Sequence, residues 1–326
     1  MTIRLLFAMA LGIGLQCAGP ASAQEWPAHP MTMVVAFPAG GSDDILGRII
    51  ASRMSELLGQ PVSVENVAGG GGATATAQVA KAAPDGYRFM LGTSATHALS
   101  QVLRKTPPYD ASADFAPVAL VAEQPFVLIA RNDLPADNLR SFIAHAKASA
   151  APMRYGSAGI GSATQLVCAL LDAAIGIKAS HVPYNGGAPA LRDLVAGKID
   201  YFCPVVTIAI PEIERKGVRG IAMLSRERSP VLPDLATAAE QGLKDFAANT
   251  WFGVFLPKGT PAATVQRLNA AVIAAMETAS VQTRLKEIGA ALVAPERRSS
   301  AYLQQFLVSE KEKWARALMA ANIPVE

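Results

Sequence analysis

Residues 31–58 read MTMVVAFPAGGSDDILGRIIASRMSELL, and this stretch decides the fold class. Its first part, Met31–Phe37, is a short apolar run and predicts a buried strand. From Asp43 to Leu58 the apolar residues recur at intervals of three and four, which predicts an amphipathic helix. A glycine-containing junction, Pro38–Asp44, joins the two. The same unit of strand, junction and helix recurs along the chain, so the sequence predicts an α/β protein.

The later strand candidates are separated from one another by helical patterns. They are Val62–Glu65, Tyr87–Leu91, Phe126–Ala130, Met153–Ser157, Ala179–Val182, Ile199–Val206, Gly220–Leu224 and Trp251–Leu256. Strict alternation favours mainly parallel sheets with helices on both faces. After Pro257 the pattern is helical only, and we expect this segment to pack on the first sheet.

A chain of 326 residues is long enough for about two domains. Breaks around Glu123–Pro125 and Pro257–Pro261 divide the strand candidates into two sets. We therefore expect a two-lobed protein with two sheets flanked by helices. Lobe 1 comprises residues 24–124 and 258–326, and lobe 2 comprises residues 125–257.

The N-terminus has the pattern of a secretory signal peptide. Arg4 precedes the apolar run Leu5–Leu15, and Ala21-Ser22-Ala23 is a cleavage pattern of small residues. The apolar run is shorter than the ~20 residues that span a bilayer. We expect cleavage after Ala23 and export of the mature protein. A lipoprotein signal at Cys17 is the alternative, although Gln16 stands where a small residue is expected.

Composition excludes several classes of protein. Hydrophobic residues make up 51% and charged residues 17%, which is typical of a globular chain and not of a disordered one. The net charge is only +3 and no basic cluster exceeds a pair of residues, which argues against nucleic-acid binding. No Cys/His pattern with metal-ligand spacing occurs, so we expect no metal and no cofactor.

Two cysteines remain after signal cleavage, Cys168 and Cys203. An oxidising compartment permits a disulfide between them. Each lies in an apolar stretch, LVCALL or YFCPVV, which is typical of a buried free thiol. We expect free thiols, with the disulfide as the alternative.

Three junctions between strand and helix are rich in glycine and hydroxyl residues. They are Pro38–Asp44, Tyr155–Ser162 and Val182–Gly187. In open parallel sheets, ligands bind beyond the carboxyl ends of the strands, where helix N-termini present unpaired N–H groups. The junctions are either tight turns or parts of one anion-binding site, and three at comparable places favour the site.

Six motifs in fixed order resemble one known family. They are VVAFPAGGSDDILGR (34–48), APDGYRFML (83–91), YDASADFAPV (109–118), YGSAGIGS (155–162), HVPYNGGAPALRDLVAGKIDYF (181–202) and WFGVFLPKGTP (251–261). Over essentially the whole mature chain, the sequence is similar to the Bug-type extracytoplasmic solute receptors of tripartite tricarboxylate transporters. The resemblance implies a periplasmic, monomeric Venus-flytrap receptor that captures a small organic acid and delivers it to a membrane permease.

The resemblance also implies which residues bind the ligand. In lobe 1 they are Phe37, Ala39, Gly40, Gly41, Ser42, Asp43, Thr93 and Ser94, and in lobe 2 they are Ser157, Gly159, Ser162, Thr164, Tyr184 and Gly186. The N–H groups of Gly40, Gly41 and Ser42 would hold one carboxylate. Ser157, Gly159 and Ser162 would hold the opposite end, and Tyr184 with Gly186 would close the wall.

Two residues depart from the family pattern. Asp43 adds a carboxylate beside the usual acid, Asp44. It either stabilises the start of its own helix or faces the cleft, where it would favour a ligand with an amine or a hydroxyl. Gln165 stands where the family often has His, and we expect it to be a solvated helix residue.

Other functions find little support in the sequence. Ser157 does not match the G-x-S-x-G pattern of a hydrolase, and no spacing requires His181 to lie beside it. Of the histidines, only His97 follows a site segment closely enough to approach the cleft. We expect a binding protein that is not an enzyme. A sensory receptor without a role in transport is the alternative.

Overall fold

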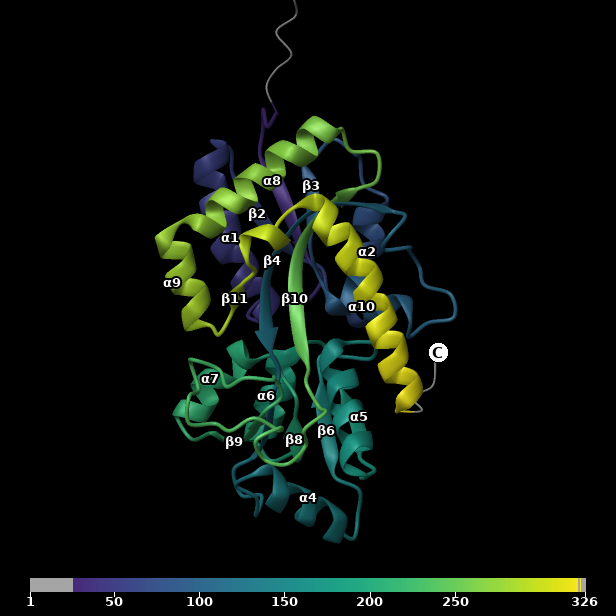
Figure 1. Ribbon diagram of the computed structural model, residues 1–326, viewed down its shortest axis with the longest axis vertical. Helices are drawn as coiled ribbons and strands as arrows, with labels where there is room; N and C mark the ends of the chain where they lie inside the picture. The colour runs from purple at the N-terminus through teal and green to yellow at the C-terminus, as the bar shows by residue number, and fades with distance from the viewer. Residues whose placement is uncertain (1–25, 322, 324–326) are drawn as a thin grey trace, which may run out of the picture.

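The computed structural model describes residues 26–321 and 323. The predicted signal peptide and its cleavage site lie outside these residues. The described chain forms two lobes, each built on one sheet flanked by helices (Figure 1). The predicted fold class is confirmed.

The sheet of lobe 1 has six strands in the order β11-β4-β10-β3-β1-β2. They are β1 (Met31–Val35), β2 (Val62–Asn66), β3 (Arg88–Thr93), β4 (Phe115–Pro125), β10 (Asn249–Pro257) and β11 (Ala291–Leu292). β1 runs parallel to β2 and β3, whereas β10 is antiparallel to β3 and β4. β11 is antiparallel to β4.

The sheet of lobe 2 has five strands in the order β7-β6-β8-β5-β9. They are β5 (Val127–Arg131), β6 (Arg154–Ser157), β7 (Ser180–Pro183), β8 (Tyr201–Phe202) and β9 (Val218–Met223). β6 is parallel to β7 and β8, but β5 is antiparallel to β8 and β9. Both sheets are therefore mixed rather than mainly parallel. The strands that connect the lobes introduce the antiparallel pairs.

Helices cover both sheets. They are α1 (Ser42–Leu58), α2 (Ala73–Ala80), α3 (Ser94–His97), α4 (Leu139–Ala148), α5 (Ala163–Ile175), α6 (Gly187–Val195), α7 (Val206–Glu214), α8 (Ala262–Glu277), α9 (Ala279–Glu287) and α10 (Ser300–Ala320). Short 3₁₀ turns lie at Gly70–Gly72, Leu99–Gln101 and Pro295–Arg297. α8 and α10 pack against β4, which confirms that the C-terminal segment returns to lobe 1 (Figure 1).

The chain crosses between the lobes at two adjacent points. β4 ends in the first sheet at Pro125 and β5 begins in the second sheet at Val127. The return crossing lies before Asn249, because β10 pairs along its whole length with β4. The predicted boundary at residue 257 placed this strand in lobe 2 and is wrong. Residues 251–256 are buried and apolar, so their composition suits either sheet.

A disulfide joins Cys168 on α5 to Cys203, which directly follows β8. The two Cα atoms are 5.5 Å apart, within the usual range for a bridge. The expectation of free thiols is therefore wrong. Both sulfur atoms are buried as the apolar sequence suggests, but α5 and β8 bring them together from positions 35 residues apart.

Candidate ligand-binding site

A cavity between the lobes is lined by the starts of four helices of two or more turns, and by Ala95 of the one-turn helix α3. α1 contributes from lobe 1, and α5, α6 and α7 contribute from lobe 2. The first N–H groups of a helix have no acceptor within the helix, and its N-terminus carries a partial positive charge. Four such ends around one cavity favour an anionic ligand.

The lining of this cavity is almost uncharged. It consists of Phe37, Pro38, Ala39, Gly41, Ser42, Asp43, Thr93, Ala95, Phe126, Ala158, Ser162, Ala163, Thr164, Gly186, Gly187, Ala188, Pro189, Val205, Ile208 and Thr250. Asp43 is the single ionisable side chain among these residues. An anion would therefore be held by backbone dipoles and hydroxyl groups instead of by an arginine or lysine.

The predicted site residues divide into three groups. Those that line the cavity are Phe37, Ala39, Gly41, Ser42, Asp43, Thr93, Ser162, Thr164 and Gly186. Gly159 and Tyr184 line a neighbouring cavity, which shares Phe37, Pro38, Ala158 and Gly186 with the first. Gly40, Ser94 and Ser157 line neither of the two.

In lobe 1, the loop before α1 leaves backbone donors unused. No side chain caps α1 at Gly41, and the first helix-type bond runs from Ile45 N–H to the Gly41 carbonyl at 3.0 Å. The N–H groups of Ser42, Asp43 and Asp44 consequently have no acceptor within the helix. They are the donors best placed to hold a carboxylate.

Gly40 is different, because its N–H donates to Asp44 Oδ2 at 2.9 Å. The expectation that this group holds the ligand is therefore not supported. Asp44 Oδ1 accepts from Arg48 Nε at 2.8 Å. Burial would raise the pKa of Asp44, but the bonds from Arg48 and Gly40 outweigh burial and lower it. Asp44 is thus an ionised residue that shapes the loop.

Asp43 faces the cavity and is half-buried. Within the described structure its carboxylate takes part in no hydrogen bond or ion pair. Burial, together with the neighbouring charge of Asp44, raises the pKa of Asp43 to about 7. Of the two interpretations of Asp43, the structure favours the one in which it faces the cleft.

The end of β3 adds one more unused polar group. Thr93 and Thr96 form a capping box at the start of α3, in which Thr93 N–H donates to Thr96 Oγ1 at 2.9 Å. The buried Thr93 hydroxyl makes no hydrogen bond of normal geometry with a described residue. Ser94 does not line the cavity, and its hydroxyl pairs with Oγ1 of the lining residue Thr250 at 2.8 Å. His97 is buried and stacks on Phe255, and burial lowers its pKa to about 3. It does not line the cavity.

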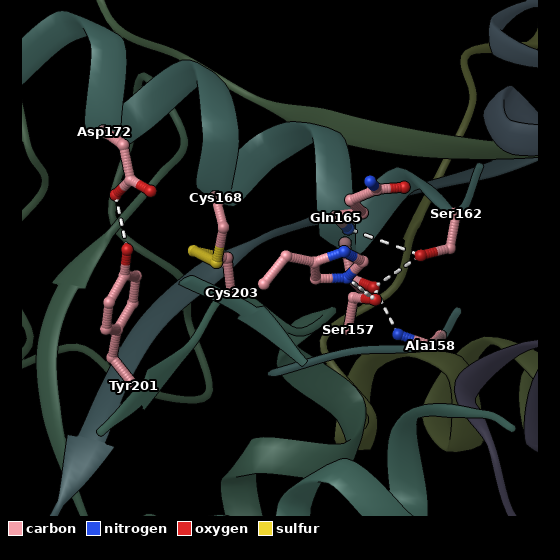
Figure 2. Close-up of a disulfide and its surroundings, with 10 residues drawn as sticks. Ser157, Ala158, Ser162, Gln165, Cys168, Asp172, Tyr201 and Cys203 are labelled. Carbon is pink, nitrogen blue, oxygen red and sulfur yellow. Dashed lines mark hydrogen bonds between the residues drawn. A yellow bond between two sulfur atoms is a disulfide. The ribbon is translucent and has the colours of Figure 1, made fainter. Parts of the chain in front are cut away.

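In lobe 2, the corresponding loop is bonded to itself (Figure 2). Ala158 N–H donates to Thr164 Oγ1 at 2.8 Å, and Gly161 N–H donates to Gln165 Oε1 at 2.7 Å. Ser162 Oγ caps α5 by accepting from Gln165 N–H at 3.3 Å. Gln165 therefore fixes the loop, and its expected role as a solvated residue is wrong. The N–H groups of Ala163 and Thr164 have no acceptor within α5, and both residues line the cavity.

Ser157 and Gly159 are also engaged within this loop. Ser157 Oγ lies 2.6 Å from His181 Nε2 and accepts from Gly159 N–H at 3.1 Å. Tyr184 donates its hydroxyl to Asp193 Oδ2 at 3.0 Å. The expected ligand contacts of Ser157, Gly159 and the Tyr184 hydroxyl are not supported by this geometry.

Several cavity residues escaped the sequence analysis. Gly187, Ala188 and Pro189 begin α6, Val205 and Ile208 belong to the start of α7, and Phe126 and Thr250 lie at the crossings. The α6 segment lies inside a quoted motif and could have been included. The apolar residues carry no signal that separates a cavity wall from a core.

The lobes touch each other through glycines. A Cβ atom at Gly71 of lobe 1 would lie only 2.6 Å from the Ile160 carbonyl oxygen of lobe 2. Similarly, a Cβ atom at Gly186 of lobe 2 would lie 2.9 Å from Pro38 Cγ of lobe 1. These approaches are possible only without side chains, so the structure represents a closed arrangement of the lobes.

Two α/β lobes, joined by two crossings and enclosing an anion-favouring cavity, define a solute-binding protein of the periplasmic type. The family model for the tripartite tricarboxylate transporter family receptor matches residues 46–323, and the chain belongs to this family. BugT from Bordetella pertussis is 34% identical over 309 residues, covering 94% of each chain. The family resemblance is thereby confirmed.

Solved structures agree with this assignment. MatC (Rpa3494) from Rhodopseudomonas palustris with bound malate is 37% identical, has a TM-score of 0.86 and covers 90% of this chain and 100% of its own. Rpa4515 from R. palustris with adipate is 34% identical, with a TM-score of 0.87, and covers 91% of this chain and 99% of its own. In the described part of this chain, no helix is long and apolar enough to span a membrane.

Proposed function

We propose that the chain binds a small organic carboxylate in the cavity between its lobes and presents it to the permease of a tripartite tricarboxylate transporter. The observation that carries this proposal is the convergence of four helix starts, from both lobes, on one cavity without a cationic side chain. Relatives solved with malate and adipate support the same ligand class.

In this proposal, both lobes hold the ligand through the backbone. One carboxylate accepts from the N–H groups of residues 42–44 and from the Thr93 hydroxyl. The N–H groups of Ala163 and Thr164 meet the ligand from the other side. A hydrogen bond to a charged group contributes roughly 1.5–3 kcal/mol, so a few such bonds reach the ~8 kcal/mol of micromolar binding.

We further propose a monomeric receptor in the periplasm, with the signal peptide removed after Ala23 and without a cofactor. Its partners would be the ligand and the membrane subunits of the transporter. A sensory receptor would share the cavity but not these subunits. Copurification with the permease distinguishes the two roles.

A hydrolytic activity is not part of the proposal, although Ser157 lies beside His181. Ser157 is fully buried and lines neither cavity, so its hydroxyl cannot reach a ligand between the lobes. Burial also lowers the pKa of His181. The pair instead connects the ends of β6 and β7, where Ser157 and Pro183 are already in register.

Calorimetric titration of the mature protein with succinate, malate and adipate tests the proposed function. At least one acid should bind with micromolar affinity and be recovered unchanged by mass spectrometry. Thr93→Val should weaken this binding about tenfold, because it removes one hydroxyl bond. Thr264→Val on α8, which does not line the cavity, is the matched control. Chemical conversion of the acid, or equal effects of the two variants, would contradict the proposal.

A further inference from the structure

The charge on the cavity wall conflicts with a simple anion site. The helix starts favour a carboxylate, yet the one ionisable side chain among the lining residues is itself an acid, Asp43. A ligand with carboxylates alone would bring further negative charge against it. Some property of the ligand must compensate for Asp43 if the residue is ionised.

Asp43 has no structural task that explains its position. A carboxylate in the first turn of a helix interacts favourably with the helix dipole. Asp44 already provides this carboxylate, and it also accepts from Gly40 N–H and Arg48 Nε. Asp43 makes no such bond in the described structure and is directed to the cavity. Its carboxylate is therefore available to a ligand.

A second group points to the same place. Thr93 is only 3% exposed, and its hydroxyl, which lies in the capping box with Thr96, makes no hydrogen bond of normal geometry with a described residue. It lines the cavity together with Asp43. Buried polar groups are rarely left unpaired in proteins, so this part of the cavity is built for a polar ligand group.

We propose that Asp43 selects a ligand that carries a protonated amine next to a carboxylate, as in an α-amino acid. This inference rests on the proposed function. The carboxylate would accept from the free N–H groups at the start of α1, and the ammonium group would donate to the Asp43 carboxylate. Both protein groups belong to one helical turn, and both ligand groups are attached to one carbon atom, so a single small molecule can contact both.

An ammonium group suits Asp43 better than a hydroxyl does. It has three donors and a full positive charge, so it forms a charge-assisted bond and neutralises the acid. A hydroxyl forms a weaker bond and leaves the negative charge in place. A ligand with an unsubstituted carbon at this position forms neither bond.

Matched ligands that differ only at the second carbon test this inference. We would titrate the mature protein at pH 8 with L-aspartate, L-malate and succinate, and with the longer series L-glutamate, L-2-hydroxyglutarate and glutarate. In at least one series, the amino acid should bind at least tenfold more tightly than the unsubstituted acid. Asp43→Asn should weaken binding of the amino acid at least tenfold and strengthen binding of the unsubstituted acid.

Two further variants secure the experiment. Glu56→Gln removes the same charge from an exposed position near the end of α1 and should leave the ligand preference unchanged. Asp43→Thr provides a second replacement in case the asparagine variant does not fold.

The possible failures are distinguishable. If unsubstituted acids bind to the native protein as tightly as amino acids do, the inference is wrong and the proposed function stands. If Asp43→Asn strengthens all members of a series equally, Asp43 only repels anions and the inference is also wrong. If none of the six acids binds, the proposed function is wrong, and this inference, which rests on it, is wrong as well.

Discussion

The two loops that face each other across the cavity are built differently. In the loop of lobe 1, residues 37–44, three backbone N–H groups at the start of α1 and the Asp43 carboxylate have no internal partner. In the loop of lobe 2, residues 157–165, side chains of the loop itself accept from Ala158, Gly159 and Gly161. Lobe 1 therefore offers three free N–H groups and a carboxylate, whereas lobe 2 offers the N–H groups of Ala163 and Thr164 on a loop whose other polar groups are largely bonded before the ligand arrives. A fixed surface loses less conformational entropy on binding.

The support beneath the two loops differs as well. Gln165, Cys168 and Asp172 lie along α5, and each holds the helix to its surroundings through a side chain (Figure 2). α1 packs on lobe 1 through apolar residues such as Leu46, Ile50 and Met54. Apolar residues such as Leu166, Val167 and Leu171 pack α5 as well, so in lobe 2 the disulfide and the buried Asp172–Tyr201 bond add to hydrophobic packing.

Among the predicted effects on the two lobes, the largest should come from removing the disulfide that supports α5 of lobe 2. The double variant Cys168→Ala/Cys203→Ala opens a loop of 35 residues, which should lower the free energy of unfolding by roughly 3–4 kcal/mol. We expect the melting temperature to fall by about 10 °C.

Dithiothreitol provides the control for this variant. It should lower the melting temperature of the native protein toward that of the double variant and leave the double variant unchanged. If thiol labelling shows the bridge reduced while the melting temperature of the native protein stays constant, the disulfide does not support lobe 2.

The disulfide also illustrates which parts of the fold the sequence can predict. Local patterns predicted α1, the α/β class and the return of the C-terminal helices to lobe 1. They could not predict the pairing of Cys168 with Cys203, because an apolar stretch suits a buried thiol and a buried bridge equally. They also missed β4, and they assigned β10 to the wrong lobe, because strand pairing is a tertiary property that local composition does not determine.

The second prediction concerns ligand affinity, which should depend on the close approach of Gly71 in lobe 1 to Ile160 in lobe 2. Gly71→Ala places a Cβ atom against the Ile160 carbonyl oxygen and should prevent full closure. We expect carboxylate affinity to fall at least tenfold, which corresponds to about 1.4 kcal/mol. Isothermal titration with whichever acid binds the native protein measures this loss.

Gly59→Ala is the matched control. Gly59 has a φ of 66°, close to the 63° of Gly71, but a Cβ atom there would meet nothing within 4 Å. Both variants carry the same backbone strain, roughly 1–2 kcal/mol, so both should lower the stability of the unliganded protein similarly. Equal affinities of the two variants would show that closure does not depend on the approach at Gly71.

The site was predictable to the extent that helix starts are visible in a sequence. The junction at residues 38–44 and the segment 162–164 reach the cavity as expected from their position after strands. Local hydrogen bonding removed Gly40, Ser94 and Ser157 from the predicted set. The sequence does not show whether a glycine N–H or a serine hydroxyl is bonded within the protein or is free for a ligand. Only the contacts with Asp44, Thr250 and His181 show that Gly40, Ser94 and Ser157 are bonded internally.

The third prediction concerns two acids that are shielded from solvent, one in each lobe. The pKa of Asp172, like that of Asp43, is raised by burial to about 7, but Asp172 accepts a hydrogen bond from the Tyr201 hydroxyl at 2.6 Å. Between its ordinary pKa of 3.8 and about 7, Asp172 is protonated in the folded state and ionised in the unfolded state. The folded state then binds more protons, so stability falls as pH rises through this window, by up to about 1.4 kcal/mol per pH unit.

Asp172→Asn should therefore flatten the loss of stability between pH 5 and pH 7, as measured by urea unfolding, and leave the ligand preference unchanged. Asp43→Asn should instead change the ligand preference, because its carboxylate faces the cavity. The asparagine at position 172 can still accept from Tyr201 through its amide oxygen, so the difference in slope reports the ionisation alone. Parallel stability profiles of the native protein and Asp172→Asn would mean that Asp172 is not protonated in the folded state. In that case the difference between the lobes would be confined to the loops at the cavity and would not include Asp43 and Asp172.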